Sequence, residues 1–393
     1  MTDLIQPSLL RLTAILVLCS LSACRNDTAA VKQDREFNNR LGTIERIRTA
    51  YSDHVHRGAK ASLLQPKVLA VPSPPLPQVQ EKPIIQTASF LSPGLASVGA
   101  ATMRQTKTTL IAFETAPFPY SGTIARTDKP FMNISEGGRR GHRTPFNRVY
   151  WEDETYNDPR VLLHIPRGFD IKRPAVMVLF FHGHGATLER DVHLRQEVPR
   201  QISESGMNAI LVAPQLAVDA RDSSPGKFWE PGAVKRFLAE AATKLARLQG
   251  NPQSRQTFAN MPVVIVAYSG GFLPAAWTMA GGGFGKRLRG VVLLDALYGE
   301  TDRFADWIVN QRAGFFVSAF ADSTRVKNTA FERTLAERAV PVKTELSERL
   351  GPGSVVFLGT GPETDHRDFV TQAWTRYPVK DLLQRMTMAD RRL

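Results

Sequence analysis

The chain has 393 residues, of which 42% are hydrophobic, and its formal net charge is +13. The apolar content excludes a wholly disordered chain, and the composition indicates one large domain behind an amino-terminal extension. The basic residues are spread along the chain and form no run interleaved with aromatic residues, which argues against a nucleic-acid groove.

The first residues have the layout of a secretory signal. Arg11 precedes an apolar run over residues 12–21, which is too short for a bilayer span of about 20 residues. Leu21-Ser22-Ala23-Cys24 resembles the lipobox of bacterial lipoproteins. That resemblance implies that residues 1–23 are a signal peptide and that Cys24 carries lipid. The mature protein is then anchored to the bilayer in the bacterial cell envelope and faces the periplasm.

Two further features bear on this location. In the resembling lipoproteins an Asp after the lipidated cysteine favours the inner membrane, and Arg25 here favours the outer membrane. A basic protein held at a membrane is also compatible with anionic lipid or anionic wall polymer as a partner. Cys19 and Cys24 are the two cysteines of the chain, so the mature protein has no disulfide.

Residues 24–105 are predicted to be a flexible tether. They are poor in aromatic residues and include a Pro-rich stretch at 71–83, which favours extended, semi-rigid conformations within a disordered segment. A short helix is predicted within the tether near residues 37–55. The folded domain is expected over residues 106–393.

After residue 106, apolar runs alternate with amphipathic segments. This pattern predicts an α/β fold with a mostly parallel central sheet and helices on both faces. The expected strands are residues 161–165, 175–181, 209–213, 263–267, 291–294, 315–320 and 355–358. The expected helices are residues 194–205, 231–248, 271–280, 302–309, 329–339 and a carboxyl-terminal stretch from 368.

Ser269 lies between a predicted strand and a predicted helix, in the sequence Ala267-Tyr268-Ser269-Gly270-Gly271. A nucleophile elbow needs small residues two before and two after the serine, because the strand and helix backbones pass close together there. Ala267 departs from the usual glycine by one methyl group, and Gly271 fits. The pattern therefore favours Ser269 as a nucleophile over a serine in an ordinary turn.

A serine nucleophile needs a histidine base, and His366 is the one histidine of eight that follows Ser269. It comes just after the predicted strand at 355–358. Earlier, His182-Gly183-His184-Gly185 follows the predicted strand at 175–181. Taken in this order, the HG element, the AYSGG elbow and the late histidine resemble the α/β-hydrolase superfamily. The resemblance covers the chain from about residue 106 to its end.

The resemblance implies a Ser-His-Asp acyl-enzyme mechanism that requires neither a metal nor an organic cofactor. Its oxyanion hole uses the backbone N–H groups of Gly270 and His184. Two acids remain candidates. Asp295 is preferred because it ends a strongly apolar strand, and Asp322, after the later strand, is the alternative.

Other interpretations remain open. His182, His184 and His193, with Glu189 and Asp191, form a short cluster that could suggest zinc. A non-catalytic envelope binding lipoprotein on a hydrolase fold is a further alternative.

The substrate is less defined by the sequence. Trp229, in a loop at residues 220–232, and Gln215 are the candidate substrate-binding residues. The alternative interpretation is that Phe228 and Trp229 anchor the helix that follows. A small or medium carboxylic ester is expected, since no large apolar insertion suggests a deep lipase lid. A cell-wall peptide amide, cleaved by an amidase or peptidase, is the alternative.

Overall fold

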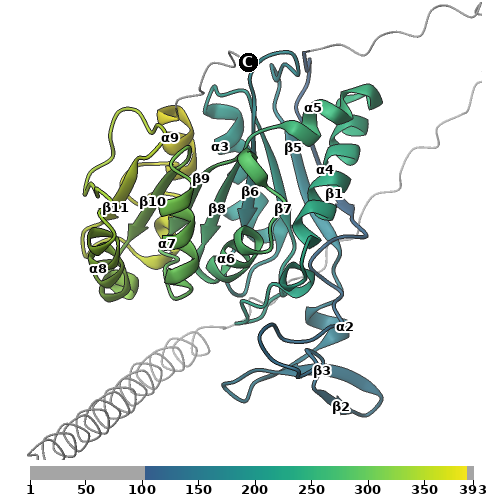
Figure 1. Ribbon diagram of the computed structural model, residues 1–393. Coiled ribbons are helices and arrows are strands. Elements are labelled where there is room, and N and C mark those ends of the chain that lie inside the picture. Colours follow the sequence, from purple (N-terminus) through teal and green to yellow (C-terminus); the bar gives the residue numbers. More distant parts are fainter. Residues whose placement is uncertain (1–101, 387–393) are drawn as a thin grey trace, which may run out of the picture. The chain divides into compact units, whose positions relative to one another are not determined.

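The computed structural model describes residues 102–386. Its core is an eight-stranded sheet in the order β1-β5-β7-β6-β8-β9-β10-β11 (Figure 1). Within this sheet β5 runs antiparallel to β1 and β7, and the other neighbours are parallel. The strands are β1 (Lys107–Ala112), β5 (Arg160–Ile165), β6 (Val176–Phe181), β7 (Ala209–Pro214), β8 (Val263–Tyr268), β9 (Leu288–Leu294), β10 (Phe315–Phe320) and β11 (Val355–Gly359).

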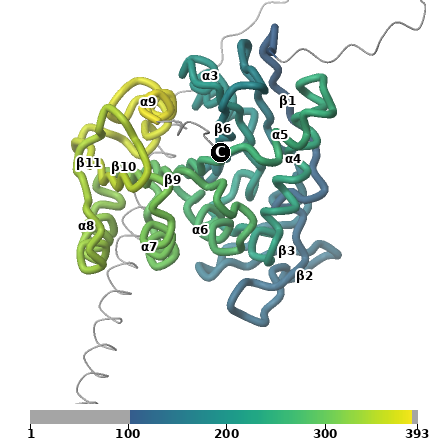
Figure 2. Tube along the Cα trace, turned by 45° about the horizontal axis from the view of Figure 1, so that its top comes forward, coloured from purple at the N-terminus to yellow at the C-terminus, as the bar shows by residue number. Residues whose placement is uncertain are grey.

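Helices cover both faces of this sheet, so the central strands are buried along their whole length. One apolar cluster joins the sheet to α4, α5, α6, α7 and α8, and a second joins its other face to α3 and α9. Figure 2 shows α3 and α9 on one side and α6, α7 and α8 on the other. These helices are α3 (Val198–Glu204), α4 (Ala233–Gln249), α5 (Arg255–Asn260), α6 (Phe272–Ala280), α7 (Thr301–Asn310), α8 (Asp322–Glu337) and α9 (Pro378–Arg385). The predicted fold class is confirmed.

Three of the predicted helices differ from those observed. The helix expected at 194–205 is a π-helical segment, Leu188–Arg195, followed by α3, and Glu197 between them has a φ of 50°. The helix α8 begins at Asp322 instead of 329, directly after the extended residue Ala321. The stretch from 368 belongs to a 3₁₀ turn, His366–Val370, and α9 starts only at Pro378, whose fixed φ suits a first helical turn.

An insertion that the sequence analysis did not predict connects β1 to β5. It contains β2 (Ile134–Glu136), β3 (Arg139–Arg143), β4 (Val149–Trp151) and α2 (Glu152–Thr155). Its aromatic side chains, with Trp229, build a separate apolar cluster of Phe118, Tyr120, Phe131 and Tyr156. The Val218 N–H donates to the Thr155 carbonyl at 3.0 Å, which fixes the insertion to the loop after β7. It therefore lies at the carboxyl edge of the sheet (Figure 1).

The ends of the described domain lie at the opposite, amino edge. Thr102 pairs with Asp170, and Met103 is buried in the core, so the folded domain starts at least four residues before the predicted boundary at 106. At the other end, the Leu350 N–H, shortly before β11, donates to the Arg385 carbonyl at 2.7 Å. The signal peptide, Cys24 and nearly all of the predicted tether lie outside the described residues. Among residues 102–386, no helix combines the length and apolar character that crossing a bilayer requires.

Candidate active site

Ser269 occupies the sharp turn between β8 and α6. Its φ is 53°, a conformation that L-residues rarely adopt outside such turns. A Cβ on Gly183 would lie 2.8 Å from the Ser269 Cβ, and a Cβ on Gly271 would lie 2.4 Å from the Phe181 carbonyl oxygen. The glycines allow the end of β6 to approach the elbow closely. The requirement for small residues around Ser269 thus follows from two backbones in contact.

The His366 side chain connects Ser269 to Asp295. Its Nε2 lies 2.8 Å from the Ser269 Oγ, and its Nδ1 lies 2.5 Å from the Asp295 Oδ2. Because an ionised carboxylate only accepts hydrogen bonds, Nδ1 carries the proton and donates it to Asp295. The neutral ring then presents a lone pair on Nε2 to the Ser269 hydroxyl, which is the arrangement of a general base beside a nucleophile.

Asp295 is fully buried, and three side chains satisfy its carboxylate. Besides His366, the Thr324 hydroxyl donates to Oδ1 at 2.5 Å and the Ser323 hydroxyl donates to Oδ2. Burial alone would raise the pKa of Asp295, but these hydrogen bonds outweigh it and hold the pKa below its ordinary value. Asp295 is therefore ionised at neutral pH beside the imidazole.

Asp322, the alternative acid, occupies a different environment. Its side chain is 77% exposed and pairs with Arg325 at 2.9 Å at the start of α8. The two residues that follow it, Ser323 and Thr324, are those that donate to Asp295. This segment thus reaches the site through its hydroxyl groups, whereas the Asp322 carboxylate points to solvent.

Aromatic rings hold the imidazole in place. The Tyr268 ring stacks on His366 with centroids 5.2 Å apart, and the Tyr298 ring meets it edge-on at 6.5 Å. The Tyr268 hydroxyl also donates to the His366 carbonyl at 3.1 Å. Burial raises the pKa of Tyr268, so this phenol stays protonated and keeps donating. The imidazole is fixed from one face and one edge.

The HG element is braced from inside the protein by His182 and Gln215. The His182 Nδ1 donates to the Gly183 carbonyl at 2.8 Å, and its Nε2 accepts from the Leu216 N–H at 2.9 Å. The Gln215 Oε1 accepts from the Leu188 N–H at 2.9 Å, and its amide nitrogen lies 3.0 Å from the His182 Nε2. The prediction that Gln215 binds substrate is wrong, because this side chain is fully buried and holds the loop instead.

His184 contacts the elbow with its side chain as well as its backbone. A Cβ on Gly270 would lie 2.4 Å from the His184 Cδ2, so the imidazole covers the start of the helix turn. Its Nε2 lies 2.7 Å from the Ser223 hydroxyl oxygen, and the Gly185 N–H donates to the Ala220 carbonyl at 2.9 Å. The two residues predicted for the oxyanion hole, Gly270 and His184, are therefore neighbours beside Ser269.

The loop at 220–232 serves mainly as an anchor. Phe228 is buried in the main core and packs edge-on against Phe181 and Phe237. Trp229 is half-buried and packs against Tyr120 and Phe131 of the insertion, with ring centroids 5.8 and 5.6 Å apart. The interpretation of Phe228 as a helix anchor is confirmed, and contact between Trp229 and substrate stays a prediction.

The zinc interpretation finds no support in the arrangement of side chains. Over residues 102–386, no three His, Cys, Asp or Glu side chains gather as metal ligands would. His182 is engaged as described above, and Asp191 accepts from Arg190 and from Arg195.

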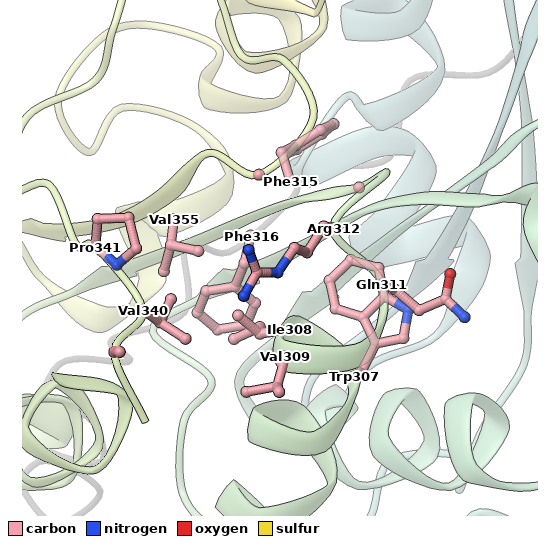
Figure 3. Close-up of a pocket in the computed structure, with 13 residues that line it drawn as sticks. Trp307, Ile308, Val309, Gln311, Arg312, Phe315, Phe316, Val340, Pro341 and Val355 are labelled. Carbon is pink, nitrogen blue, oxygen red and sulfur yellow. The ribbon is translucent and has the colours of Figure 1, made fainter. Parts of the chain in front are cut away.

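A mostly apolar cavity of about 140 Å³, whose lining also includes Gln311 and Arg312, lies away from the site. Its walls come from α7 and from the starts of β10 and β11, and they include Trp307, Ile308, Phe316 and Val355 (Figure 3). The starts of these parallel strands lie at the amino edge of the sheet, whereas Ser269 follows the carboxyl end of β8. This cavity is therefore unrelated to the triad.

A pH dependence of stability follows from two buried histidines. Burial lowers the pKa of His182 and of His164 to about 4, from an ordinary 6.5. Between these values the unfolded chain binds more protons than the folded one, so stability falls as the pH falls. At pH 4.5 each histidine should lower the free energy of unfolding by roughly 2.5 kcal/mol relative to its value at pH 7.

Urea unfolding at pH 7 and pH 4.5 checks this expectation. His164 lies in β5, between the Thr108 and Ser203 hydroxyl groups, away from the triad. The variant His164→Gln should lose less stability on acidification than the wild type, whatever its stability at pH 7. An equal loss in both proteins would contradict the assignment.

Comparisons with known proteins add structural neighbours and no family. No protein-family model and no curated protein matches the chain. Among solved structures it is similar to a mutant feruloyl esterase module from Clostridium thermocellum, with 15% identity, 68% of this chain and 95% of that one covered, and a TM-score of 0.39. It is also similar to an S-formylglutathione hydrolase from Agrobacterium tumefaciens, with 13% identity, 60% of this chain and 92% of that one covered, and a TM-score of 0.34. A third similar structure is an IroE-like serine hydrolase from Shewanella oneidensis, with 14% identity, 59% of this chain and 75% of that one covered, and a TM-score of 0.33. Similarity at this level leaves the substrate undetermined.

Proposed function

We propose that this chain, whose fold is that of the α/β-hydrolases, is a serine hydrolase that cleaves a carboxylic ester. The observation that carries the proposal is the continuous hydrogen-bonded series from Ser269 through His366 to Asp295, built on a strained strand-to-helix turn. A fold alone would not imply activity. Here the nucleophile lies within hydrogen-bond distance of the base, and the base lies within hydrogen-bond distance of a buried anion. This is the arrangement that activates a serine hydroxyl.

The proposed reaction is a two-step acyl transfer. His366 removes the proton of Ser269 as the Ser269 Oγ attacks the ester carbonyl, and the backbone N–H groups of Gly270 and His184 stabilise the oxyanion. The imidazolium then protonates the departing alkoxide. Water, deprotonated by His366, attacks the acyl-enzyme, and the imidazolium then returns a proton to the Ser269 Oγ as the acid leaves. Asp295 stays ionised throughout and stabilises the imidazolium at each step.

An ester is preferred over a wall-peptide amide because an alkoxide is a far better leaving group than the anion of an amine. Phe272 and Tyr298 pack together beside His366, with ring centroids 5.9 Å apart, and both side chains are half-buried. They offer an apolar surface for a small or medium acyl or alcohol group. We further propose that the enzyme works in the bacterial envelope, facing the periplasm and held at the bilayer by acylated Cys24, with the outer membrane favoured.

The test is covalent labelling of the purified protein with a fluorophosphonate probe, followed by peptide mass spectrometry. The expected result is one adduct, on Ser269, and none in the Ser269→Ala variant, since the probe reports an activated serine. A panel of esters and wall-peptide amides then separates esterase from amidase activity. A folded wild-type protein without an adduct would favour the non-catalytic binding lipoprotein.

A further inference from the structure

An open cavity of about 600 Å³ lies beside the loop that carries His366. It is bounded by the end of the π-helical segment on one side and by the 3₁₀ turn and the residues before α9 on the other. Its walls are Arg195, Glu197, Arg367, Asp368, Thr371, Gln372, Arg376 and Tyr377. In contrast to the cavity at the amino edge, nearly all of these side chains are polar, and three of them are arginines.

The two carboxylates of the cavity are already occupied. Glu197 pairs with Arg200 at 2.8 Å and accepts from the Tyr377 hydroxyl at 2.9 Å. The Asp368 Oδ1 accepts from the Gln372 amide at 3.0 Å. These contacts satisfy the acids with groups other than the cavity's own arginines.

The three arginines form fewer hydrogen bonds and ion pairs than the two carboxylates do. Arg195 donates from Nε to Asp191 at 2.9 Å and its side chain is 43% exposed. Arg376 lies over the Tyr377 ring, 5.0 Å from its centroid, and donates to that hydroxyl at 3.3 Å. Its charge also acts on the Glu197 carboxylate, but it forms no ion pair among residues 102–386. Arg367 is exposed and likewise forms no ion pair within the described part of the chain. Guanidinium groups in this state are suited to carboxylate and phosphate oxygens.

The cavity is connected to the catalytic base. Arg367 and Asp368 directly follow His366 in the chain, and the Tyr268 hydroxyl holds the His366 carbonyl. The positive charge of Arg195 acts on the Tyr268 phenol, where it opposes the effect of burial on the pKa.

We propose that this cavity binds an oxyanion, a carboxylate or a phosphate, and that the ester substrate carries such a group away from its scissile bond. The second half of this statement rests on the proposed function, and the first half does not. Arg195, Arg367 and Arg376 are the anion's ligands, and binding there places the substrate against the loop of the catalytic histidine.

The first experiment measures binding without catalysis. Isothermal titration calorimetry of the Ser269→Ala protein with inorganic phosphate and with succinate, at fixed ionic strength, is expected to show binding of at least one anion. The double replacement Arg367→Gln and Arg376→Gln should weaken this anion binding about tenfold or more, given the usual strength of hydrogen bonds to charged groups. The phosphate and succinate arms distinguish the two kinds of oxyanion.

A matched variant controls for the loss of positive charge. Arg338 is also exposed, but it lies at the carboxyl end of α8, towards the amino edge of the sheet, and pairs with Asp306. The Arg338→Gln variant should bind the anion as tightly as the parent protein. If neither anion binds, or if the double replacement binds as the parent does, the cavity is not an anion site, whether or not esters are hydrolysed.

The second experiment tests the substrate. Two pairs of esters differ by one carboxylate: phenyl acetate with 4-acetoxybenzoate, and 4-nitrophenyl butyrate with mono-4-nitrophenyl glutarate. In one pair kcat/KM should favour the charged member. The Arg367/Arg376 replacement should bring the ratio of the two kcat/KM values within that pair close to one. Anion binding without any ester turnover would overturn the proposed function and leave the anion site. Turnover without preference in either pair would overturn the substrate assignment.

Discussion

Replacing Asp295 with asparagine should lower kcat about 10⁴-fold, the usual cost of losing a triad carboxylate. The reason is the direction of one hydrogen bond. An asparagine amide can donate to the His366 Nδ1, which stabilises the tautomer with its proton on Nε2. That tautomer cannot accept the Ser269 proton. Steady-state hydrolysis of a neutral ester measures the loss, and circular dichroism shows whether the variant folds.

The control for this experiment is Asp322→Asn. Asp322 is exposed and its pair with Arg325 is a surface ion pair, worth at most about 1 kcal/mol. Its replacement should leave kcat within about twofold of the wild type. A large loss in Asp322→Asn together with a near-normal Asp295→Asn would reverse the assignment of the acid.

Replacing Gly271 with alanine should damage both stability and activity. The new methyl group would lie 2.4 Å from the Phe181 carbonyl oxygen and 3.0 Å from that of His182. These atoms belong to a central strand and to the loop after it, so the elbow must move instead. Overpacking of this kind costs about 1–3 kcal/mol, and a displacement near 1 Å at a catalytic group costs about 10²-fold in rate.

Thermal unfolding and ester hydrolysis measure these two effects. Gly359→Ala is the matched control, because a methyl group there would meet its nearest neighbours at an ordinary 3.5 Å. It should be nearly neutral in both assays. A Gly271→Ala protein with wild-type Tm and kcat would show that the elbow tolerates a side chain and that the close approach is not required.

The sheet was predictable because its central strands are continuous apolar runs. The segments expected at 175–181, 209–213 and 263–267 coincide with β6, β7 and β8 within one residue at each end. The edge strand β1 was missed, since its residues KTTLIA are all exposed or half-buried and only the last three are apolar. Apolar patterns identify strands buried on both faces and say little about edges.

The insertion was missed for a different reason. Its strands have three to five residues, and arginine pairs such as Arg139 with Asp153 join β3 to the start of α2. Its aromatic cluster joins Phe118, Phe131 and Tyr156 to Trp229, which lies far away in sequence. Neither periodicity nor spacing records contacts of that kind.

At the site, order along the chain predicted which residues come together better than it predicted what each one does. Ser269, His366 and Asp295 meet as expected. Asp322, after β10, is the alternative acid in the sequence, yet it is the next two residues, Ser323 and Thr324, that reach the site and donate to Asp295. Gln215, expected to face substrate, braces the HG loop. A sequence does not show whether a polar side chain after a strand points inward or outward, because burial is a property of the packed fold.

Both ends of the described domain emerge at the amino edge of the sheet, and every group placed at the reaction centre comes from a loop at the other edge. The described domain therefore carries its chain ends on one side and its reaction centre on the opposite side. A carrier protein, a surface linker or a fluorophore fused directly at residue 102 or residue 386 should leave Ser269 open to its substrate. The domain can be immobilised or displayed from either end, and its reactive side is then turned away from the support.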